Sequence, residues 1–238
     1  MSAVTADLAR FVVEYDGDAL PDAVADHATS HFVNFVGCAL GGVDHDATRR
    51  TLAAISPVAG EGQGSLIGST RRLPPLEAAL INCQSSAAQA YDDTHLATVL
   101  HPTGPIAAPL LAEAERRPVD GQSFRTALAL GLEVACRVAA ALFLPPAKPE
   151  VGWYMTSVAG PIGAAAGVAR LIGLDAKATG RALGIAAGQS QGFRQSHGTM
   201  MTSLSPGLGS RAGYMAALLA EAGVTASDQA LEGPRGYF

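Results

Sequence analysis

Carboxylates, imidazoles and hydroxyls gather in one short polar stretch of this sequence, QAYDDTHLATVLHPTG at residues 89–104. Adjacent carboxylates repel each other, and partial burial raises the pKa of at least one of them, which is how proteins prepare a general acid or base. Asp92 and Asp93, with His95 and His101, are therefore candidates for acid–base chemistry. The alternative is an ordinary turn, because Asp-Asp-Thr after a helix is also a sequence in which an aspartate caps a backbone N–H.

A second polar stretch, SHGTMMTSLSPG at 196–207, lies between two apolar segments, and Pro206 is expected to stand at the head of the following helix. The free N–H groups at such a helix start can receive the carboxylate of a small ligand. A polar surface loop is the alternative interpretation. The polar residues of this stretch, with two that precede it, are Arg194, Gln195, Ser196, His197, Thr199, Thr202, Ser203 and Ser205.

Metal, nucleotide and serine-hydrolase chemistry are not indicated. Asp93, His95 and His101 have ligand side chains, but their spacing matches no common metal site, so no metal is expected. His27 and His31 stand four residues apart on an amphipathic helix, and a solvated pair is expected there. The glycine-rich segments do not follow a strand of a βαβ unit, and no serine occupies a GxSxG elbow.

Composition excludes several classes of partner. A net charge of −5 and scattered arginines argue against nucleic acid as a partner.

Three widely spaced cysteines form no disulfide framework, which predicts that the protein is located in a reducing cytoplasm. The most apolar stretch, Val158–Ala169, contains Pro161 and falls short of the ~20 residues of a spanning helix, so no membrane is expected. Asp7 and Arg10 interrupt the segment where a secretory signal would be apolar.

The elements that position these polar stretches are expected to be helices, because apolar residues recur at helical spacing along most of the chain. The first helix is predicted over 5–15 with Thr5 as its N-cap, and the second from Pro21 to Gly41–Gly42. Further helices are predicted at about 47–57, 75–91, 105–116, 121–143, 156–173, 176–191 and 207–222, and only GSLIG at 64–68 looks strand-like.

The helices after Thr156 are rich in glycine and alanine. Small residues three or four apart let two helix backbones approach closely. Each glycine costs about 1 kcal/mol relative to alanine in an isolated helix, so tertiary packing must hold these helices together. The irregular segment 145–153 is interpreted as a loop within the domain. Residues 1–238 are therefore predicted to form a single compact all-α domain.

Six segments resemble the MmgE/PrpD family in order and spacing. That family includes 2-methylcitrate dehydratase, cis-aconitate decarboxylase and iminodisuccinate epimerase. The resemblance implies a helical domain, proton transfer on small di- or tricarboxylates, neither metal nor organic cofactor, and a homodimer. The segments are YDDTHLATVLHPTGPIAAPLLAEAE, GLEVACRVA, GWYMTSVAGPIGAAAGVARLIGLD, ALGIAAGQSQG, GTMMTSLSPGLGSRAGYMAALLAEAGVTA and LEGPRGYF.

The sequence departs from the family pattern in two ways. Family members continue into a smaller α/β domain that covers the active site, whereas this sequence resembles the helical N-terminal part alone. The surface under that lid is then expected to be exposed, rebuilt or buried against another chain. Several polar site positions also differ: Ala90 replaces an aspartate, Tyr154 a histidine, Thr202 a lysine and Ser205 a histidine.

These replacements predict an altered specificity. Losing a lysine removes a charge that would pair with a carboxylate, and a tyrosine is a poor base at neutral pH. Asp93, Thr94 and His101 match the family's site. We expect a metal- and cofactor-independent acid–base enzyme, of lyase (dehydratase), isomerase or cyclase type, acting on a small carboxylate-derived or less charged substrate. The expected catalytic residues are Asp93, His101 and Tyr154, and the expected substrate-binding residues are Thr94, His95, Thr202, Ser203 and Ser205. The alternative is a non-catalytic binding or partner subunit that associates with another chain.

Overall fold

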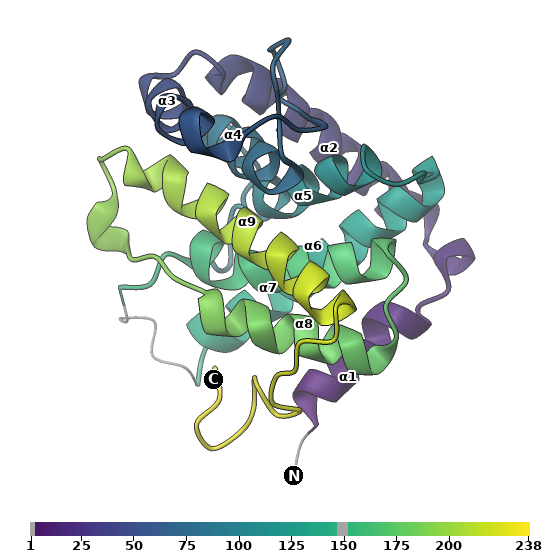
Figure 1. The fold of residues 1–238 in the computed structure, drawn as a ribbon. Coiled ribbons are helices and arrows are strands. Elements are labelled where there is room, and N and C mark those ends of the chain that lie inside the picture. The colour runs from purple at the N-terminus through teal and green to yellow at the C-terminus, as the bar shows by residue number, and fades with distance from the viewer. Residues whose placement is uncertain (1–2, 147–151) are drawn as a thin grey trace.

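The structure is a computed structural model that describes residues 3–146 and 152–238, so most of the expected 145–153 loop lies outside the described residues. The described chain is all-α, as predicted, with one two-stranded antiparallel sheet (Figure 1). Its elements are α1 (Val4–Glu14), η1 (Gly17–Ala19), α2 (Asp22–Gly42), α3 (Asp46–Ala59), β1 (Gly64–Ser65), β2 (Arg72–Leu73), α4 (Pro75–Ala87), α5 (Thr103–Ala114), α6 (Gly121–Phe143), α7 (Met155–Leu171), α8 (Ala176–Gln189), η2 (Arg194–Ser196) and α9 (Met201–Glu221).

The centre of the fold is α7, which is buried along its length from Met155 to Ala169. It packs against α5, α6, α8 and α9, and α1 lies beside α8 although the two are far apart in sequence (Figure 1). A helix that is apolar on all sides is expected in the interior. The prediction that the alanine- and glycine-rich helices pack in the core is confirmed for α7, whereas α8 buries only one face.

Close backbone contacts explain the glycines of these helices. A Cβ added at Gly131 of α6 would lie 2.9 Å from the carbonyl oxygen of Gly163 in α7. A Cβ added at Gly163 would lie 2.6 Å from the carbonyl oxygen of Gly131. Both distances are shorter than van der Waals contact, so only glycine lets α6 and α7 cross at this distance.

Two helices, α5 and α9, begin earlier than predicted because a proline was taken to mark the start of each. Pro105 lies in the first turn of α5, where no intrahelical N–H bond is needed. Pro206 lies inside α9, which begins at Met201, so the predicted start at 207 is wrong. The missing proline N–H costs one backbone hydrogen bond, and packing of α9 on α4, α7 and α8 offsets that loss.

The other differences are local. Thr5 lies inside α1 and is not its N-cap; its hydroxyl binds the Glu232 carboxylate at 2.5 Å. The strand predicted at 64–68 is confined to two residues, paired with Arg72–Leu73. By length and hydropathy alone, α6 is long and apolar enough to cross a membrane. Half of its most apolar 18-residue segment is buried inside the structure, and the core helix of a soluble protein passes the same test.

Candidate active site

The first polar stretch forms a strained loop between α4 and α5. The loop is closed by a backbone hydrogen bond from His95 N–H to the Leu100 carbonyl oxygen at 2.7 Å. Ala90 and Val99 have φ of 55°, a left-handed conformation that is unfavourable for a β-branched residue. Both residues line the same cavity. Backbone strain of this kind is often found at functional sites.

A short backbone pairing brings the second polar stretch to this loop. The Arg194 N–H donates to the Gly152 carbonyl oxygen at 2.7 Å, and the Tyr154 N–H donates to the Gly192 carbonyl oxygen at 3.2 Å. The segments before α7 and before α9 thereby meet at the 89–104 loop, around a cavity of about 230 Å³. The polar side chains that line it are Asp92, Thr98, His101, Tyr154, Arg194, His197 and Thr202.

The imidazole of His101 is held in one orientation. Its Nδ1 lies 3.1 Å from the Asp93 carbonyl oxygen and 3.0 Å from Thr94 Oγ1, and its backbone N–H donates to Thr156 Oγ1 at 3.0 Å. A carbonyl oxygen only accepts hydrogen bonds, so the neutral ring carries its proton on Nδ1. The other nitrogen, Nε2, is then the basic atom of a side chain that lines the cavity.

The two adjacent aspartates have different surroundings. Asp92 lines the cavity with its Oδ1 3.9 Å from His101 Nδ1. Burial raises the pKa of Asp92, and the charge of Asp93 adds to this effect, while His101 opposes it. The Asp93 carboxylate instead accepts from Thr103 N–H at 3.3 Å and from Thr103 Oγ1 at 2.8 Å, at the start of α5. Its Oδ2 also lies 3.3 Å from Nδ1 of His31, so His31 has a partner at this loop although its side chain is 42% exposed.

Three further groups line the cavity: a phenol, an imidazole and a guanidinium. The rings of Tyr154 and His197 meet edge to face with centroids 4.8 Å apart. Burial raises the pKa of Tyr154 to about 12, so its hydroxyl is protonated at neutral pH. Burial, with the charges of Arg194 and His101, lowers the pKa of His197, which favours its neutral form. Arg194 supplies a cation that the sequence-based prediction did not assign to this site.

The remaining predicted site residues are divided between the cavity and its surroundings. Thr202 lines the cavity, and Thr94 contacts His101. His95 does not line it, because its Nδ1 is paired with Thr98 Oγ1 at 2.8 Å within the loop. Ser203 and Ser205 are buried and do not line it either. Because α9 begins at Met201, these serines are on a helix and lie about 100° and 300° around it from Thr202.

Sequence reasoning did not assign a site role to Arg194 or His197, and it selected Asp93 over Asp92. The signal that points to these residues is the second polar stretch, which contains His197 and directly follows Arg194 and Gln195. Among the residues that the structure describes, no group of three or more His, Cys, Asp or Glu side chains is arranged to hold a metal ion.

Comparison with known proteins agrees with the resemblance seen in the sequence. Residues 6–238 match the MmgE/PrpD N-terminal domain. The chain is 30% identical to the cis-aconitate decarboxylase-like protein oryM of Aspergillus oryzae, over 99% of this chain and 50% of that protein. It is 26% identical to the cis-aconitate decarboxylase of Aspergillus terreus, over 100% of this chain and 49% of that protein. The human cis-aconitate decarboxylase is 30% identical over 70% of this chain and 35% of its own length.

The chain spans about half the length, or less, of these curated relatives. The names of the relatives suggest a family of the lyase type. A family match over nearly all of the chain, together with an all-helical fold, leads to one conclusion: this chain belongs to the MmgE/PrpD family.

Proposed function

We propose that this chain provides the acid–base site of a lyase- or isomerase-type enzyme that acts on a small carboxylate-derived substrate. One observation carries the proposal. A base, a neutral proton donor and a cation, which are His101, Tyr154 and Arg194, line a single small cavity. The family membership and the names of the relatives support the same reaction class.

Each group has a role that follows from its surroundings. The Arg194 guanidinium binds a substrate carboxylate, because a charge-assisted pair with a carboxylate is strong and directional. His101 Nε2 removes a proton from the carbon next to that carboxylate, and its Nδ1–H stays bound to the Asp93 carbonyl oxygen. Tyr154, protonated at neutral pH, donates a hydrogen bond or a proton to the developing negative charge or to the leaving group.

The aspartates and the threonine assist these groups. We place Asp92 beside the imidazole, where its negative charge stabilises the protonated His101 after proton transfer. Asp93 acts through its hydrogen bonds to Thr103 and fixes the loop that carries His101. Thr202 orients the substrate. Neither a metal nor an organic cofactor takes part in this proposal.

The substrate class follows from size and charge. A cavity of about 230 Å³ is smaller than most ligand pockets, which favours a compact substrate. Among the described residues that line it, Arg194 is the one permanent cation. A tricarboxylate such as cis-aconitate, on which the Aspergillus terreus and human relatives act by their names, would leave carboxylates without a cation. We therefore propose a substrate with fewer carboxylates.

Proton exchange measured by NMR in deuterated water tests the function without requiring the full reaction. The purified chain is incubated with mono-, di- and tricarboxylates, including cis-aconitate, and the loss of C–H signals is followed. His101→Ala should lower the exchange rate of the active compound by about 10²–10⁴-fold. His27→Ala is the matched control, because His27 is exposed and does not line the cavity. Equal exchange rates in the wild type and His101→Ala would rule out His101 as the base.

One observation favours the alternative function of a non-catalytic partner subunit. Val99 and Trp153 line the cavity and Phe193 pairs with Trp153, yet these large apolar side chains are exposed by 46–57%. An exposed apolar rim is typical of a surface that another polypeptide covers. The mass of the purified chain in solution distinguishes the two functions. A homodimer that turns over substrate supports the enzyme, whereas an inactive chain that requires a different protein supports the subunit. The homodimer and the cytoplasmic location stay predictions.

A further inference from the structure

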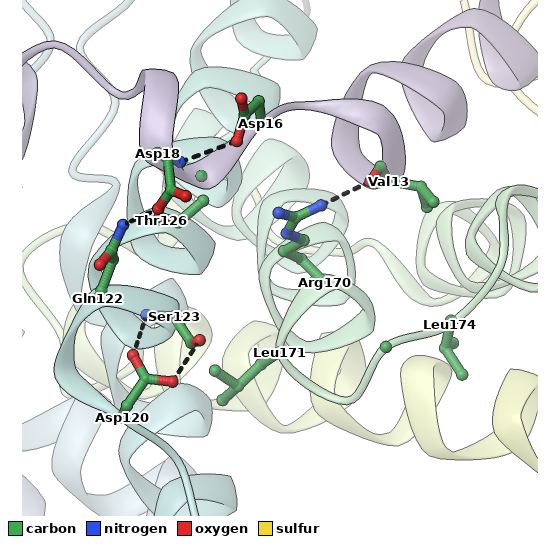
Figure 2. A pocket seen from close by; sticks show the side chains of 12 residues that line it. Val13, Asp16, Asp18, Asp120, Gln122, Ser123, Thr126, Arg170, Leu171 and Leu174 are labelled. Atoms are coloured by element: carbon green, nitrogen blue, oxygen red, sulfur yellow. Dashed lines mark hydrogen bonds between the residues drawn. The ribbon is translucent and has the colours of Figure 1, made fainter.

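A larger cavity lies at the ends of α6 and α7 that point away from the candidate active site. Its volume is about 700 Å³. Figure 2 shows the side chains that line it. The last turn of α7 contributes Arg170 to it, whereas Met155, at the first turn of α7, lines the candidate active site. The first turns of α6 contribute Thr126, whereas Phe143 at the end of α6 lines the candidate active site. The two cavities are therefore separate.

One wall of this cavity presents a guanidinium that lacks an anionic partner. Arg170 Nη1 donates to the carbonyl oxygens of Val12 and Val13 in the last turn of α1, at 3.3 and 2.6 Å. No carboxylate of the described residues lies within ion-pair distance of Arg170. Figure 2 shows the other edge of the guanidinium turned toward the side where Asp18 and Thr126 lie. Its Nη2 is 3.7 Å from the point where a Cβ of Gly17 would be.

A buried hydroxyl faces the same gap. Thr126 is 2% exposed, and among the described residues its Oγ1 has no hydrogen-bond partner. Oγ1 lies 3.4 Å from the point where a Cβ of Gly17 would be. Buried polar groups in native proteins nearly always have a partner, so an unpartnered one calls for an explanation. Two donors, from Arg170 and Thr126, thus converge on one gap, which is the arrangement that a carboxylate requires.

The rim of the cavity is acidic. It carries Asp16, Asp18 and Asp120, and one oxygen of Asp18 accepts from Gln122 Nε2 at 2.6 Å (Figure 2). The second oxygen of Asp18 and the second oxygen of Asp16 have no hydrogen-bond partner among the described residues. The three aspartates and the one arginine give the cavity a net negative charge, which repels a simple anion. A simple cation would satisfy the rim but leave the two inner donors, those of Arg170 and Thr126, without a partner.

We propose that this cavity binds a free aliphatic α-amino acid. A zwitterion is the ligand that fits both parts of the cavity. Its carboxylate lies between Arg170 Nη2 and Thr126 Oγ1, and its ammonium group faces Asp18. The half-buried side chain of Leu171 provides the apolar surface against which an aliphatic side chain packs (Figure 2).

Titration calorimetry with three matched compounds tests the charge requirement. L-leucine carries both groups, 4-methylpentanoate carries only the carboxylate, and 3-methylbutylamine carries only the ammonium group. L-leucine should bind the purified chain, and each of the other two should bind at least about tenfold more weakly, since each loses a charge-assisted contact. Equal binding of the amine and L-leucine, or no binding of L-leucine, would overturn the proposal.

Three variants test the location. Gly17→Ala places a methyl group in ordinary contact with Thr126 Oγ1 and Arg170 Nη2, so the fold tolerates it while the gap is filled. Its L-leucine affinity should fall at least about tenfold. Gly121→Ala is the control, because a Cβ there meets no atom within 4 Å. Thr126→Val should weaken binding about three- to tenfold, without lowering the unfolding midpoint, because the lost hydroxyl has no partner in the free protein.

Unchanged L-leucine affinity in Gly17→Ala would show that the gap is not the binding site. The proposal is independent of the candidate active site. His101→Ala should lower the proton-exchange rate by about 10²–10⁴-fold and leave L-leucine binding unchanged. The failure of either proposal is therefore distinguishable from the failure of the other.

Discussion

Removal of the buried carboxylate of Glu113 should destabilise the fold more than the loss of any exposed ion pair. Glu113 is fully buried in α5. Its carboxylate accepts from Nε and Nη2 of Arg116, at 3.0 and 3.2 Å, and from the hydroxyl of Tyr214. It also forms an ion pair with Arg117, whose Nε lies 2.5 Å away. Tyr214 is also fully buried, and burial raises the pKa of its hydroxyl. Glu113→Ala therefore leaves this hydroxyl without its partner.

The size of the effect follows from these contacts. Removing one partner of a buried ion pair typically costs about 3–5 kcal/mol, and a buried hydroxyl left without a partner costs about 1–3 kcal/mol. The side chains of Arg116 and Arg117 are 36% and 34% exposed, so both can turn toward water and recover part of the loss. We therefore expect a loss of about 3–4 kcal/mol, equivalent to about 6–16 °C in Tm for a chain of this length.

Urea denaturation followed by circular dichroism measures this loss. The control is Glu133→Ala, which breaks an ion pair with Arg137 whose side chains are 47% and 61% exposed and should cost less than about 1 kcal/mol. Tyr214→Phe should cost less in the Glu113→Ala background than in the wild type, because the hydroxyl has already lost its acceptor. If Glu113→Ala and Glu133→Ala unfold at the same urea concentration, the buried carboxylate does not have the stabilising role assigned to it.

Two further predictions concern the helix contact and the loop. Gly163→Ala should destabilise the protein by about 1–3 kcal/mol in the same urea assay, because the new methyl group collides with the Gly131 carbonyl. The control is Gly188→Ala, where a Cβ meets no atom within 4 Å; it should be neutral or stabilising by up to about 1 kcal/mol. Equal losses of stability in the two variants would contradict the close crossing of α6 and α7. The hydrogen bond to Asp93 raises the pKa of His31 above its ordinary value, although burial opposes it. The contact therefore stabilises the fold fully below the unfolded pKa of about 6.5, and this contribution is lost as pH rises through the higher folded pKa. Urea midpoints between pH 5.5 and 8.5 should converge for wild type and His31→Gln toward high pH, and a constant difference would argue against this linkage.

Local patterns in the sequence were sufficient to predict the helical architecture. Apolar residues at helical spacing gave most helices within a few residues, and the small residues after Thr156 indicated a buried, closely packed centre. These features can be predicted from the sequence because they depend on residues that are neighbours along one helix. Helix starts at Pro105 and Pro206 were misplaced because a proline is tolerated in a first turn, or inside a well-packed helix, as well as at the first position.

The sequence by itself determined which residue types were available for acid–base chemistry, and its motifs determined the family. Only the tertiary structure decided which of them share a cavity. Asp92 and Asp93 are neighbours in the chain, yet one lines the cavity and the other binds Thr103 and His31. Side-chain directions in a loop depend on backbone angles that the closure of the loop sets, and no periodic pattern encodes them. Arg194 joins His101 because residues 152–154 pair with 192–194, a long-range contact that leaves no signal in either segment alone.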